Sequence, residues 1–486
     1  MVLYWGRRVT LAALFLALVT WAGCVEQESP TGPHSVIHED VVAVPGYGTD
    51  CWQIAEGSDI QVCDLGTFGE FSNSWAYDVN DEGWVVGRYG EATWFGGSFF
   101  WDPATEQMED FGLTAGTLPF LVTGTNTQRQ AVGYGQAGMA VHTFLGEYVA
   151  ESGTYSLADL GVPENASSSY GLAINDKGQI AGWAQYASQR AVAWSSGWSA
   201  LWDGDGSESY ARAQDISNEG DSYALGRMVG VTSEQGGPGQ AVQWTQGSYK
   251  VILANTLGGN TSEAQAVNSC EQSDCPQIVG FAQDGQGNRR PFIWRAGQGM
   301  TELGTLGEQQ DAEGTAFDIN DAGDAVGESN TGSGDLHATL WPQGGPPVDL
   351  GTLPGGSCSS ARAISGGGIV VGYSEVSSGV YHAAVWYVGG AGPVIPETVP
   401  EIYDALEDGI DGLVNGGALS EGQGKALHAK IDASRKLYEQ GKYKGAASIL
   451  QAFINQVNAF ESEGILEASE AARLRELAEA AIAMMG

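Results

Sequence analysis

Basic residues are scarce in this chain. Of its 486 residues, 21 are lysine or arginine and 59 are aspartate or glutamate, so the formal net charge is −38. A field of this sign repels phosphate backbones, which argues against nucleic acid as a partner. It favours a solvated acidic surface that keeps the protein soluble and holds cations loosely. We therefore expect no cofactor, apart from loosely bound calcium.

Charged residues of both signs are also few, at 16% of the chain, whereas hydrophobic residues make up 42%. Disorder requires low hydrophobicity, so this composition excludes a disordered chain. The 72 glycines and 15 tryptophans instead fit many short strands joined by tight turns.

Long apolar runs are absent except near the N-terminus, where residues 9–23 read VTLAALFLALVTWAG after two arginines. This run is too short and wrongly flanked for a stable membrane-spanning helix. We interpret residues 1–23 as an export signal. Residues 24–48, which include ESPTGPHS, are predicted to be a flexible tether.

Cys24 directly follows the apolar segment, in the order Ala22-Gly23-Cys24. This arrangement resembles the lipobox of bacterial lipoproteins, which implies that the Cys24 thiol carries lipid and anchors the protein to the outer membrane or cell surface. Trp21 stands where leucine is usual, and the small residues before Cys24 also suit ordinary signal peptidase. Plain secretion is therefore the alternative.

Cysteine is rare, with six in the chain. Cys51 and Cys63 bracket a short segment, and Cys270 and Cys275 are close enough to close a small loop. In an exported chain both pairs are disulfide candidates. Cys358 is left over, and the sequence leaves its pairing open.

A strand that ends on glycine recurs seven times, as WVVG, QAVG, QIAG, RMVG, QIVG, DAVG and IVVG. The glycines, spaced 45 to 50 residues apart, are Gly87, Gly133, Gly182, Gly230, Gly280, Gly327 and Gly372. Turns such as NDEG, NDKG and NDAG precede these strands, and they predict hairpins because Asn and Asp cap their own turn while Gly supplies positive φ. A third strand ends on tryptophan in six copies, and a fourth of the type LADLG follows in several.

The strand before each turn has its own pattern. A tiny residue precedes a β-branched residue by three positions, as with Ala76 and Val79 or Ala361 and Ile364. Residues three apart on a regular strand face opposite sides, so we expect one thin and one thick face.

Four strands in a unit of roughly 47 residues are typical of propeller blades. We predict a mainly β fold, a seven-bladed β-propeller of four-stranded blades over residues 49–394. Residues 61–66, QVCDLG, look like a fourth strand with no strands before it. We expect this N-terminal strand to complete the last blade and close the ring, which removes exposed sheet edges.

The repeat pattern, DLGT-x-GG, A-x-x-IN-x-x-G-x-x-VG, HA-x-x-W and DLG, is similar to the HAF family of extracellular repeat proteins over residues 61–390. The copies at 316–351 and 361–386 fit best, and both contain His-Ala, at His337 and His382. The resemblance implies a repeat architecture and no particular reaction.

Composition changes near residue 395, where glycine thins out and alanine, leucine, glutamate and lysine rise. Helical spacing of Leu427, Ile431 and Leu437, together with start and stop signals, predicts a small helical bundle over residues 395–486. The segments GALSEGQGKALHAKIDAS and FINQVNAF resemble the FIMAH domain of bacterial secreted proteins.

Local catalytic and metal motifs are missing: there is no GxSxG, HExxH or metal-type CxxC. The motif Asp78-x-Asn80-x-x-Gly83 resembles a calcium loop but lacks a distal Glu, so we interpret it as a hairpin turn. His142, His337 and His382 share one repeat position, which predicts a shared hydrogen-bonding role. No residue is assigned as catalytic or as a metal ligand.

Aromatic residues follow several of the repeat glycines, and others fall in the loops beyond. If these loops lie on one face of the disc, their rings can stack on sugars; packing between blades is the alternative. The ligand-binding candidates are Tyr89, Trp94, Tyr134, Trp183, Tyr186, Phe281 and Tyr373.

These patterns favour a non-enzymatic binding or scaffold module at the cell surface, with a polysaccharide or a protein as ligand. A polysaccharide-active glycoside hydrolase or lyase is the alternative, since carboxylates dispersed over blades leave no local motif. That alternative predicts a unique cluster of carboxylates with Arg, His or Tyr at the axis. A calcium-assisted structural surface component is a second alternative. The oligomeric state is left open.

Overall fold

The computed structural model describes the chain in segments. These are residues 42–43, 51–54, 60–91, 94–103, 107–111, 120–149, 153–201, 208–218, 225–234, 237–245, 249–253, 257–269, 275–388, 399–415, 419–462, 465–466, 474–475, 477–478, 481–482 and 484–485. The predicted export signal, Cys24 and Cys270 lie outside them.

The described residues form thirty strands followed by three helices. The strands are β1 (Val42–Ala43), β2 (Cys51–Gln53), β3 (Ile60–Gly66), β4 (Asn73–Val79), β5 (Val85–Glu91), β6 (Trp94–Asp102), β7 (Gln107–Asp110), β8 (Leu121–Thr125), β9 (Ala131–Ala137), β10 (Ala140–Val149), β11 (Thr154–Asp159), β12 (Ser168–Ile174), β13 (Ile180–Gln185), β14 (Gln189–Trp194), β15 (Trp198–Ala200), β16 (Glu208–Ile216), β17 (Met228–Glu234), β18 (Gln240–Thr245), β19 (Tyr249–Ile252), β20 (Gly258–Val267), β21 (Gln277–Asp284), β22 (Arg289–Arg295), β23 (Gly299–Glu302), β24 (Gly314–Ile319), β25 (Ala325–Asn330), β26 (Leu336–Trp341), β27 (Val348–Asp349), β28 (Ser359–Ile364), β29 (Ile369–Ser377) and β30 (Val380–Val388). The helices are α1 (Val399–Asn415), α2 (Glu421–Glu439) and α3 (Tyr443–Ser462).

The strands of the described residues form six sheets, in which consecutive strands pair antiparallel as up-and-down meanders. One sheet of eight strands consists of two four-stranded sets, β12–β15 and β16–β19, joined by a single parallel pair between Gln189 and Tyr210. We call each four-stranded set a unit and number the units along the chain. Units 1 to 6 begin with β4, β8, β12, β16, β20 and β24, and the last unit comprises β28–β30 with β3.

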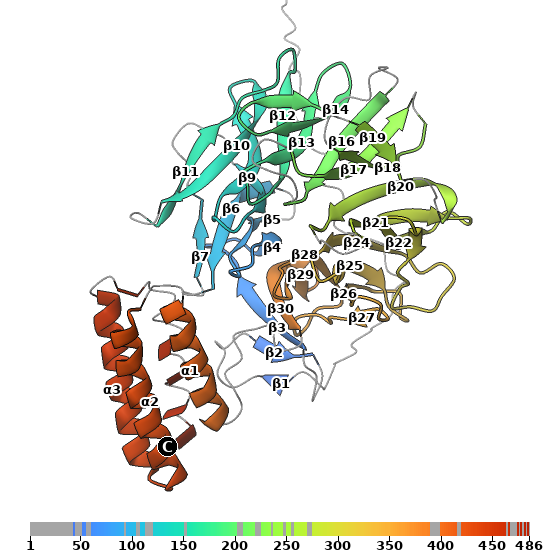
Figure 1. Ribbon diagram of the computed structural model, residues 1–486. Helices are drawn as coiled ribbons and strands as arrows, with labels where there is room; N and C mark the ends of the chain where they lie inside the picture. The colour runs from blue at the N-terminus through green and yellow to red at the C-terminus, as the bar shows by residue number, and fades with distance from the viewer. Residues whose placement is uncertain are drawn as a thin grey trace, which may run out of the picture.

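The first strand of each unit contacts the first strand of the next, and β28 of the last unit contacts β4 of unit 1. Figure 1 shows β4 and β28 near the middle of the sheets, and last strands such as β7, β11 and β27 at the outside. Cores form between neighbouring units; one joins Val85 and Phe99 of unit 1 to Val371 and Val385 of the last unit. The arrangement is β-propeller-like.

The N-terminal strand β3 pairs antiparallel with β30, with Val62 opposite Trp386 and Cys63 opposite Val385. β2 extends this sheet beyond β3, and β1 pairs with β2. Val42 and Ala43 of β1 fall inside the segment predicted to be a flexible tether. The apolar run VVAV explains this pairing, since it can hydrogen-bond to an open strand edge.

The expectation of opposite thin and thick faces was wrong. A β-bulge lies between Ala76 and Asp78, so Ala76 pairs with Gly87 while Val79 pairs with Val85. The extra residue restores the alternation, and Ala76 and Val79 share one core. The first strands of the six remaining units have a register shift at the matching position as well.

The repeat glycines sit opposite these bulges, where two backbones approach closely. A Cβ on Gly230 would lie 2.0 Å from the carbonyl oxygen of Arg212, and one on Gly182 would lie 2.0 Å from that of Tyr170. The five other repeat glycines meet the equivalent carbonyl at 2.0 to 2.2 Å. Glycine is therefore required at this position by the fold, whatever the protein binds.

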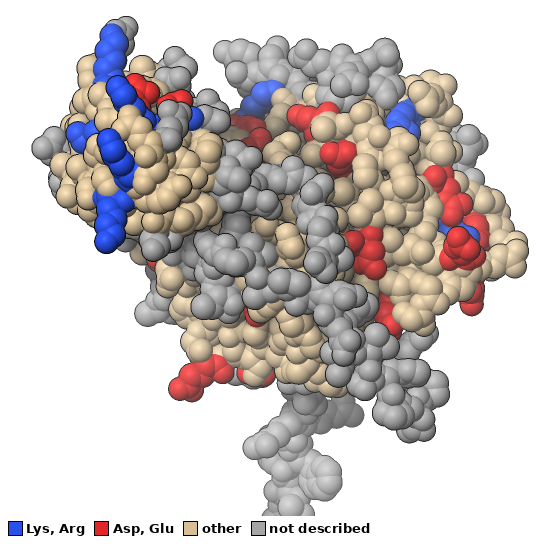
Figure 2. Space-filling model, turned by 90° about the horizontal axis from the view of Figure 1, so that it is seen from below, with Lys and Arg blue, Asp and Glu red and all other residues tan. Residues whose placement is uncertain are grey.

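The three helices bury Tyr403, Leu427, Ile431, Phe453 and Val457 in a common core. Ser420 caps α2 through a capping box with Gln423, as its place before the helix indicates. In the face shown in Figure 2, Lys and Arg side chains gather where the helices lie, whereas Asp and Glu are spread over the sheets. Among the described helices, none is long and apolar enough to cross a membrane.

Candidate functional site

The Asn-Asp turns predicted from the sequence join neighbouring units. Asn80 Oδ1 accepts hydrogen bonds from the backbone N–H groups of Glu82 and Trp84, at 3.1 and 2.9 Å, and so caps its own turn. Its Nδ2 donates to the carbonyl of Asn126 in the next unit, at 3.0 Å. The same bond to the next unit is made by Asn126, Asn175, Asn268 and Asn320. The side-chain oxygen of Asn80 is thus used inside the fold, as the hairpin interpretation requires.

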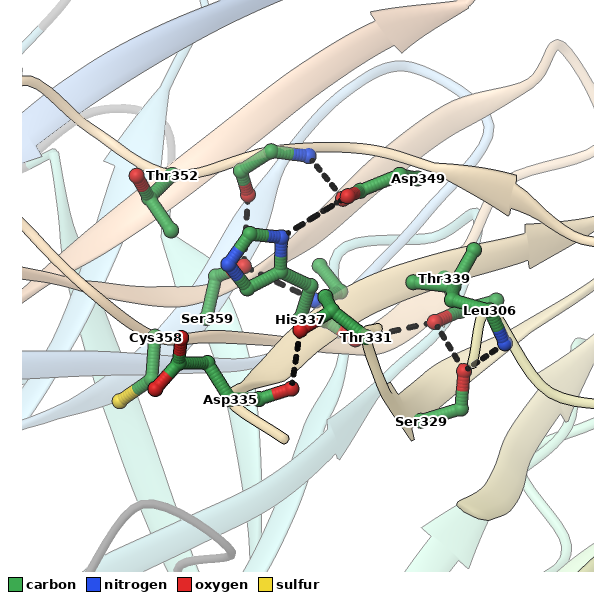
Figure 3. Close-up of polar contacts among 12 residues, drawn as sticks. Leu306, Ser329, Thr331, Asp335, His337, Thr339, Asp349, Thr352, Cys358 and Ser359 are labelled. Carbon is green, nitrogen blue, oxygen red and sulfur yellow. Dashed lines mark hydrogen bonds and ion pairs between the residues drawn. The ribbon is translucent and has the colours of Figure 1, made fainter. Parts of the chain in front are cut away.

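The repeated histidines have the shared hydrogen-bonding role predicted for them. His337 Nδ1 lies 2.9 Å from both carboxylate oxygens of Asp349, and the same carboxylate accepts the N–H of Gly351 (Figure 3). His142 pairs with Asp159, and His382 pairs with Asp64, in the same way. Each pair joins the third strand of a unit to the strand that completes the unit. Nδ1 of each imidazole is therefore engaged in a contact that holds two strands together.

A serine on the first strand ties unit 1, unit 3 and the last unit each to the unit before it. Ser359 Oγ donates to the carbonyl of Gly351 at 2.6 Å and accepts the N–H of Ala338 at 2.9 Å (Figure 3). Ser169 makes the equivalent bonds, and Ser74 makes them from unit 1 to the last unit. The residues that repeat most regularly are therefore structural.

Three aspartates on the first strands of units 1, 4 and 6 form a different cluster. Asp78, Asp215 and Asp318 each accept a backbone N–H from the following unit, at 2.7 to 2.9 Å. Burial, with the charge of Asp215, raises the pKa of Asp318 to about 7, and burial raises the pKa of Asp215 to about 6. Burial, then the charge of Asp318, raises the pKa of Asp78 well above its usual range. Because the charge of Asp215 acts on Asp318 and the charge of Asp318 acts on Asp78, the three carboxylates lie within range of one another's charge.

A pocket of about 390 Å³ opens between units 3 and 4. Its lining is polar and does not follow the repeat: Gln185, Ser188, Gln189, Tyr210, Arg212, Val231 and Glu263. The side chains come from the facing ends of β13 and β14 and the turn between them, from β16 and β17, and from β20 of unit 5. A pocket of this volume with convergent polar groups is the candidate ligand site.

Arg212 is held in place at the pocket wall. Its Nε donates to Gln189 Oε1 at 2.9 Å, and its guanidinium lies 5.4 Å from the ring centre of Trp183. Trp183 itself stacks on Tyr170 with ring centres 3.9 Å apart and planes inclined by 8°. The arginine is therefore oriented by two neighbours before any ligand arrives.

Glu263 faces the same pocket from unit 5. Gln214 Nε2 donates to its Oε1 at 2.6 Å. Burial raises the pKa of the Glu263 carboxyl, while the bond from Gln214 and the charges of Arg212 and Arg289 oppose that rise. Burial, together with the charge of Glu263, also raises the pKa of Tyr210. The lining thus combines a cation, a carboxyl group, amides and hydroxyls.

Several of the predicted aromatic candidates are covered by other side chains. Trp183 lies between Tyr170 and Arg212, Phe281 has the Arg289 guanidinium 4.2 Å from its ring centre, and Tyr373 accepts a hydrogen bond from Arg362 at 2.9 Å. Tyr89 is buried against Phe68 and Phe71, and Tyr134 packs on Tyr170. The side chain of Trp94 lies outside the described residues.

Two of these aromatic candidates belong to the pocket region. The Trp183 ring packs against the Arg212 guanidinium. Tyr186 lies in the hairpin that contributes Gln185 and Ser188 to the lining. The structure does not bring Tyr89, Phe281 or Tyr373 into the lining.

Sequence reasoning missed Arg212, Glu263, Gln189 and Tyr210. The available signal was a break in the repeat: Arg212 and Glu263 directly precede the tiny residues of their strands, where other units have Trp, Leu, Tyr, Thr or Ser. A charged residue beside an otherwise constant position marks a place where the units differ.

One of the two predicted cysteine pairs is confirmed among the described residues. Cys51 and Cys63 form a disulfide between β2 and β3. Cys275 and Cys358 are disulfide-bonded as well, so no cysteine among the described residues is free. In the same residues, no group of three or more His, Cys, Asp or Glu side chains is placed to hold a metal ion.

Comparison with known proteins assigns the C-terminal helices. Residues 403–483 match the FIMAH domain. The resemblance noted from the sequence is thus confirmed for the FIMAH domain, which covers α2, α3 and most of α1. No curated protein matches the chain.

Solved structures similar to this chain have low identity. The extracellular domain of a one-component system from B. thetaiotaomicron is 7% identical, with a TM-score of 0.40, and the match covers 67% of this chain and 39% of that one. The BP39L lectin from Burkholderia pseudomallei is 12% identical, with a TM-score of 0.35 and coverage of 68% and 95%. A Trypanosoma rangeli sialidase in complex with the inhibitor DANA is 12% identical, with a TM-score of 0.36 and coverage of 62% and 59%.

Proposed function

We propose that this chain is an exported, non-enzymatic carbohydrate-binding protein whose ligand occupies the pocket between units 3 and 4. The observation that carries the proposal is the lining itself, in which a fixed guanidinium, two glutamine amides, a serine and a tyrosine converge on one opening. Planar amide and guanidinium groups hydrogen-bond to adjacent hydroxyls, which sugars present in pairs.

The architecture that presents this pocket is a closed seven-bladed propeller of the HAF type. The pairing of β3 with β30 and the contact of β28 with β4 support closure, since each joins the first part of the ring to the last. The Asn bond to the next unit, which five of the seven units make, supports equivalent blades. A closed ring holds the pocket side chains on strands that are fixed on both sides.

The export route remains part of the proposal. Disulfides are typical of oxidising compartments, and Cys51–Cys63 is one. Attachment of lipid at Cys24 predicts incorporation of labelled palmitate into the protein in cells, lost on Cys24→Ser. Absence of label from the wild type argues for plain secretion, and label that survives the substitution argues against Cys24 as the attachment site.

Binding is tested by screening oxidised residues 25–486 on a glycan array and titrating the hits by calorimetry. Gln185→Ala removes an amide from the pocket, and we expect it to weaken binding at least tenfold. Gln136→Ala is the matched control, because Gln136 holds the same repeat position in unit 2, outside the pocket. Absence of any hit, or equal effects of the two substitutions, contradicts the proposal.

A glycoside hydrolase or lyase is the second candidate, favoured by one observation. Glu263 lines the pocket and burial raises its pKa, and a carboxyl group with a raised pKa can serve as a general acid. Sustained release of oligosaccharides by the wild type, abolished in Glu263→Gln, would establish this activity. Binding without any product supports the non-enzymatic proposal.

A further inference from the structure

We infer that the ligand of this pocket carries a carboxylate, as a uronic or other acidic sugar does, and that Arg212 binds it with both outer nitrogens. This inference rests on the proposed function and narrows it to a ligand class. It is argued from the geometry of Arg212, the placement of Glu263 and the charge of the whole protein.

Arg212 presents an unused hydrogen-bonding edge. Its Nε donates a hydrogen bond to Gln189 Oε1 at 2.9 Å, and its guanidinium lies over the ring of Trp183. Nη1 and Nη2 have no hydrogen-bond partner within the described part of the chain, and the half-buried side chain lines the pocket. The parallel N–H bonds of a guanidinium match the two oxygens of a carboxylate in spacing and direction.

Glu263 does not satisfy this edge. The described residues contain no ion pair between Arg212 and Glu263, although both line the pocket. The Glu263 carboxylate is instead bonded by Gln214 at 2.6 Å and influenced by the charge of Arg289. Two cations therefore flank one carboxyl group, and the pocket retains a positive local field.

A positive local field contrasts with the negative charge of the protein as a whole. With a net charge of −38, most of its surface repels an acidic glycan. At physiological salt the repulsion is screened beyond roughly 8 Å, so the local field of the pocket decides binding there. Hydroxyls of a neutral sugar can accept hydrogen bonds from these nitrogens, but the bonds to a carboxylate are charge-assisted and roughly twice as strong, which favours acidic ligands.

The test uses pairs of glycans that differ in the carboxylate alone. Oligomers of α-1,4-linked galacturonate and of α-1,4-linked galactose are one such pair, and an array extends the comparison to other linkages. Residues 25–486 with disulfides intact are titrated at neutral pH. We expect the hits to be acidic glycans, bound at least tenfold more tightly than their neutral counterparts and more weakly at high salt.

Substitution then assigns the contact. Arg212→Gln is expected to reduce affinity for the acidic glycan at least tenfold and to reduce any binding of the neutral glycan much less. Arg212→Lys keeps the positive charge but cannot make two parallel N–H bonds. Its affinity for the acidic glycan is therefore expected to lie between that of the wild type and that of Arg212→Gln. Arg88→Gln is the matched control, because Arg88 also lies over an aromatic ring, 3.9 Å from the centre of Trp75, but does not line the pocket. Unchanged melting temperatures establish that the variants fold.

The outcomes separate the inference from the function beneath it. If only neutral glycans bind, the inference that the ligand carries a carboxylate is wrong, while the proposed carbohydrate-binding function stands. Equal losses for acidic and neutral glycans in Arg212→Gln also overturn it, as does an Arg212→Lys variant that binds like the wild type, which would reduce the fork to a point charge. No hit of either class overturns the inference and the proposed function together.

Discussion

His382 and Asp64 lie 318 positions apart in the sequence, yet Nδ1 of His382 is 2.7 Å from Oδ2 of Asp64. The pair joins β30 to β3 just as His142 joins Asp159 within unit 2. The last unit is therefore completed from the N-terminal part of the chain by the contact that other units make internally.

This contact predicts a measurable loss of stability. Asp64→Ala removes the partner of His382 and the acceptor of the Gly66 N–H, which bonds to Asp64 at 2.7 Å. We expect the free energy of unfolding to fall by about 1–3 kcal/mol, measured by chemical denaturation. Glu70→Ala, at an exposed position close by, is the control and should change it by less than about 0.5 kcal/mol. Equal effects would mean that the pair contributes nothing specific.

The repeat glycines predict a sharp positional contrast. Gly230→Ala places a Cβ 2.0 Å from the Arg212 carbonyl oxygen, so two paired strands must separate. We expect a loss of about 3 kcal/mol or more, or failure to fold. Gly197→Ala, where a Cβ meets nothing within 4 Å, should leave the stability nearly unchanged. Thermal melts of both variants measure the contrast. A well-folded Gly230→Ala variant with wild-type stability would contradict the close approach.

The three inner aspartates predict that the sheets are more stable in mild acid. The pKa of Asp318 is raised to about 7 and that of Asp215 to about 6, against roughly 3.9 in an unfolded chain. The folded state thus holds protons more tightly, so its stability falls as pH rises from about 4 to about 7 and then levels off.

Asp318→Asn tests this dependence. We expect the melting temperature of the variant to change less between pH 5 and pH 8 than that of the wild type, because one of the buried ionisations is gone. Asp335→Asn removes the same charge from an exposed turn and should keep the wild-type slope. Parallel slopes for all three proteins would show that general surface charge sets the dependence.

The disulfide between Cys51 and Cys63 predicts that β2 depends on a covalent link. The bond closes a loop with a sequence separation of 12 and holds β2 on β3. Replacing both cysteines by serine should lower the free energy of unfolding by about 2–3 kcal/mol. Hydrogen exchange should rise first in β2, while the FIMAH helices serve as an internal reference. Unchanged exchange in β2 would contradict this role.

Much of the scaffold could be predicted because it repeats. The Asn80 turn, the His337 position and the glycines each recur, and a recurring residue in a repeat protein reports a bond that every unit needs. Helical spacing likewise sufficed for the C-terminal bundle. The bulge beside Ala76 was not predicted, because a spacing of three between Ala76 and Val79 fits both the two faces of a regular strand and one face of a bulged strand.

The candidate site was harder to predict for the opposite reason. Arg212, Gln189 and Glu263 come from three different units and act together only because their strands converge. No spacing in the sequence reports that convergence. The aromatic candidates were chosen by repeat position, and arginines or other aromatic rings cover several of them.

The sequence by itself determined the repeat, its turns, the pairing of Cys51 with Cys63 as a candidate, and the C-terminal helical domain. Each depends on local backbone geometry or on helical and strand periodicity. Only the tertiary structure decided that the outer nitrogens of Arg212 have no partner within the described part of the chain and lie in one pocket with the half-buried Glu263. That arrangement arises where strands from separate units meet, and the free energy of a charged pocket depends on distances between side chains that sequence order does not encode.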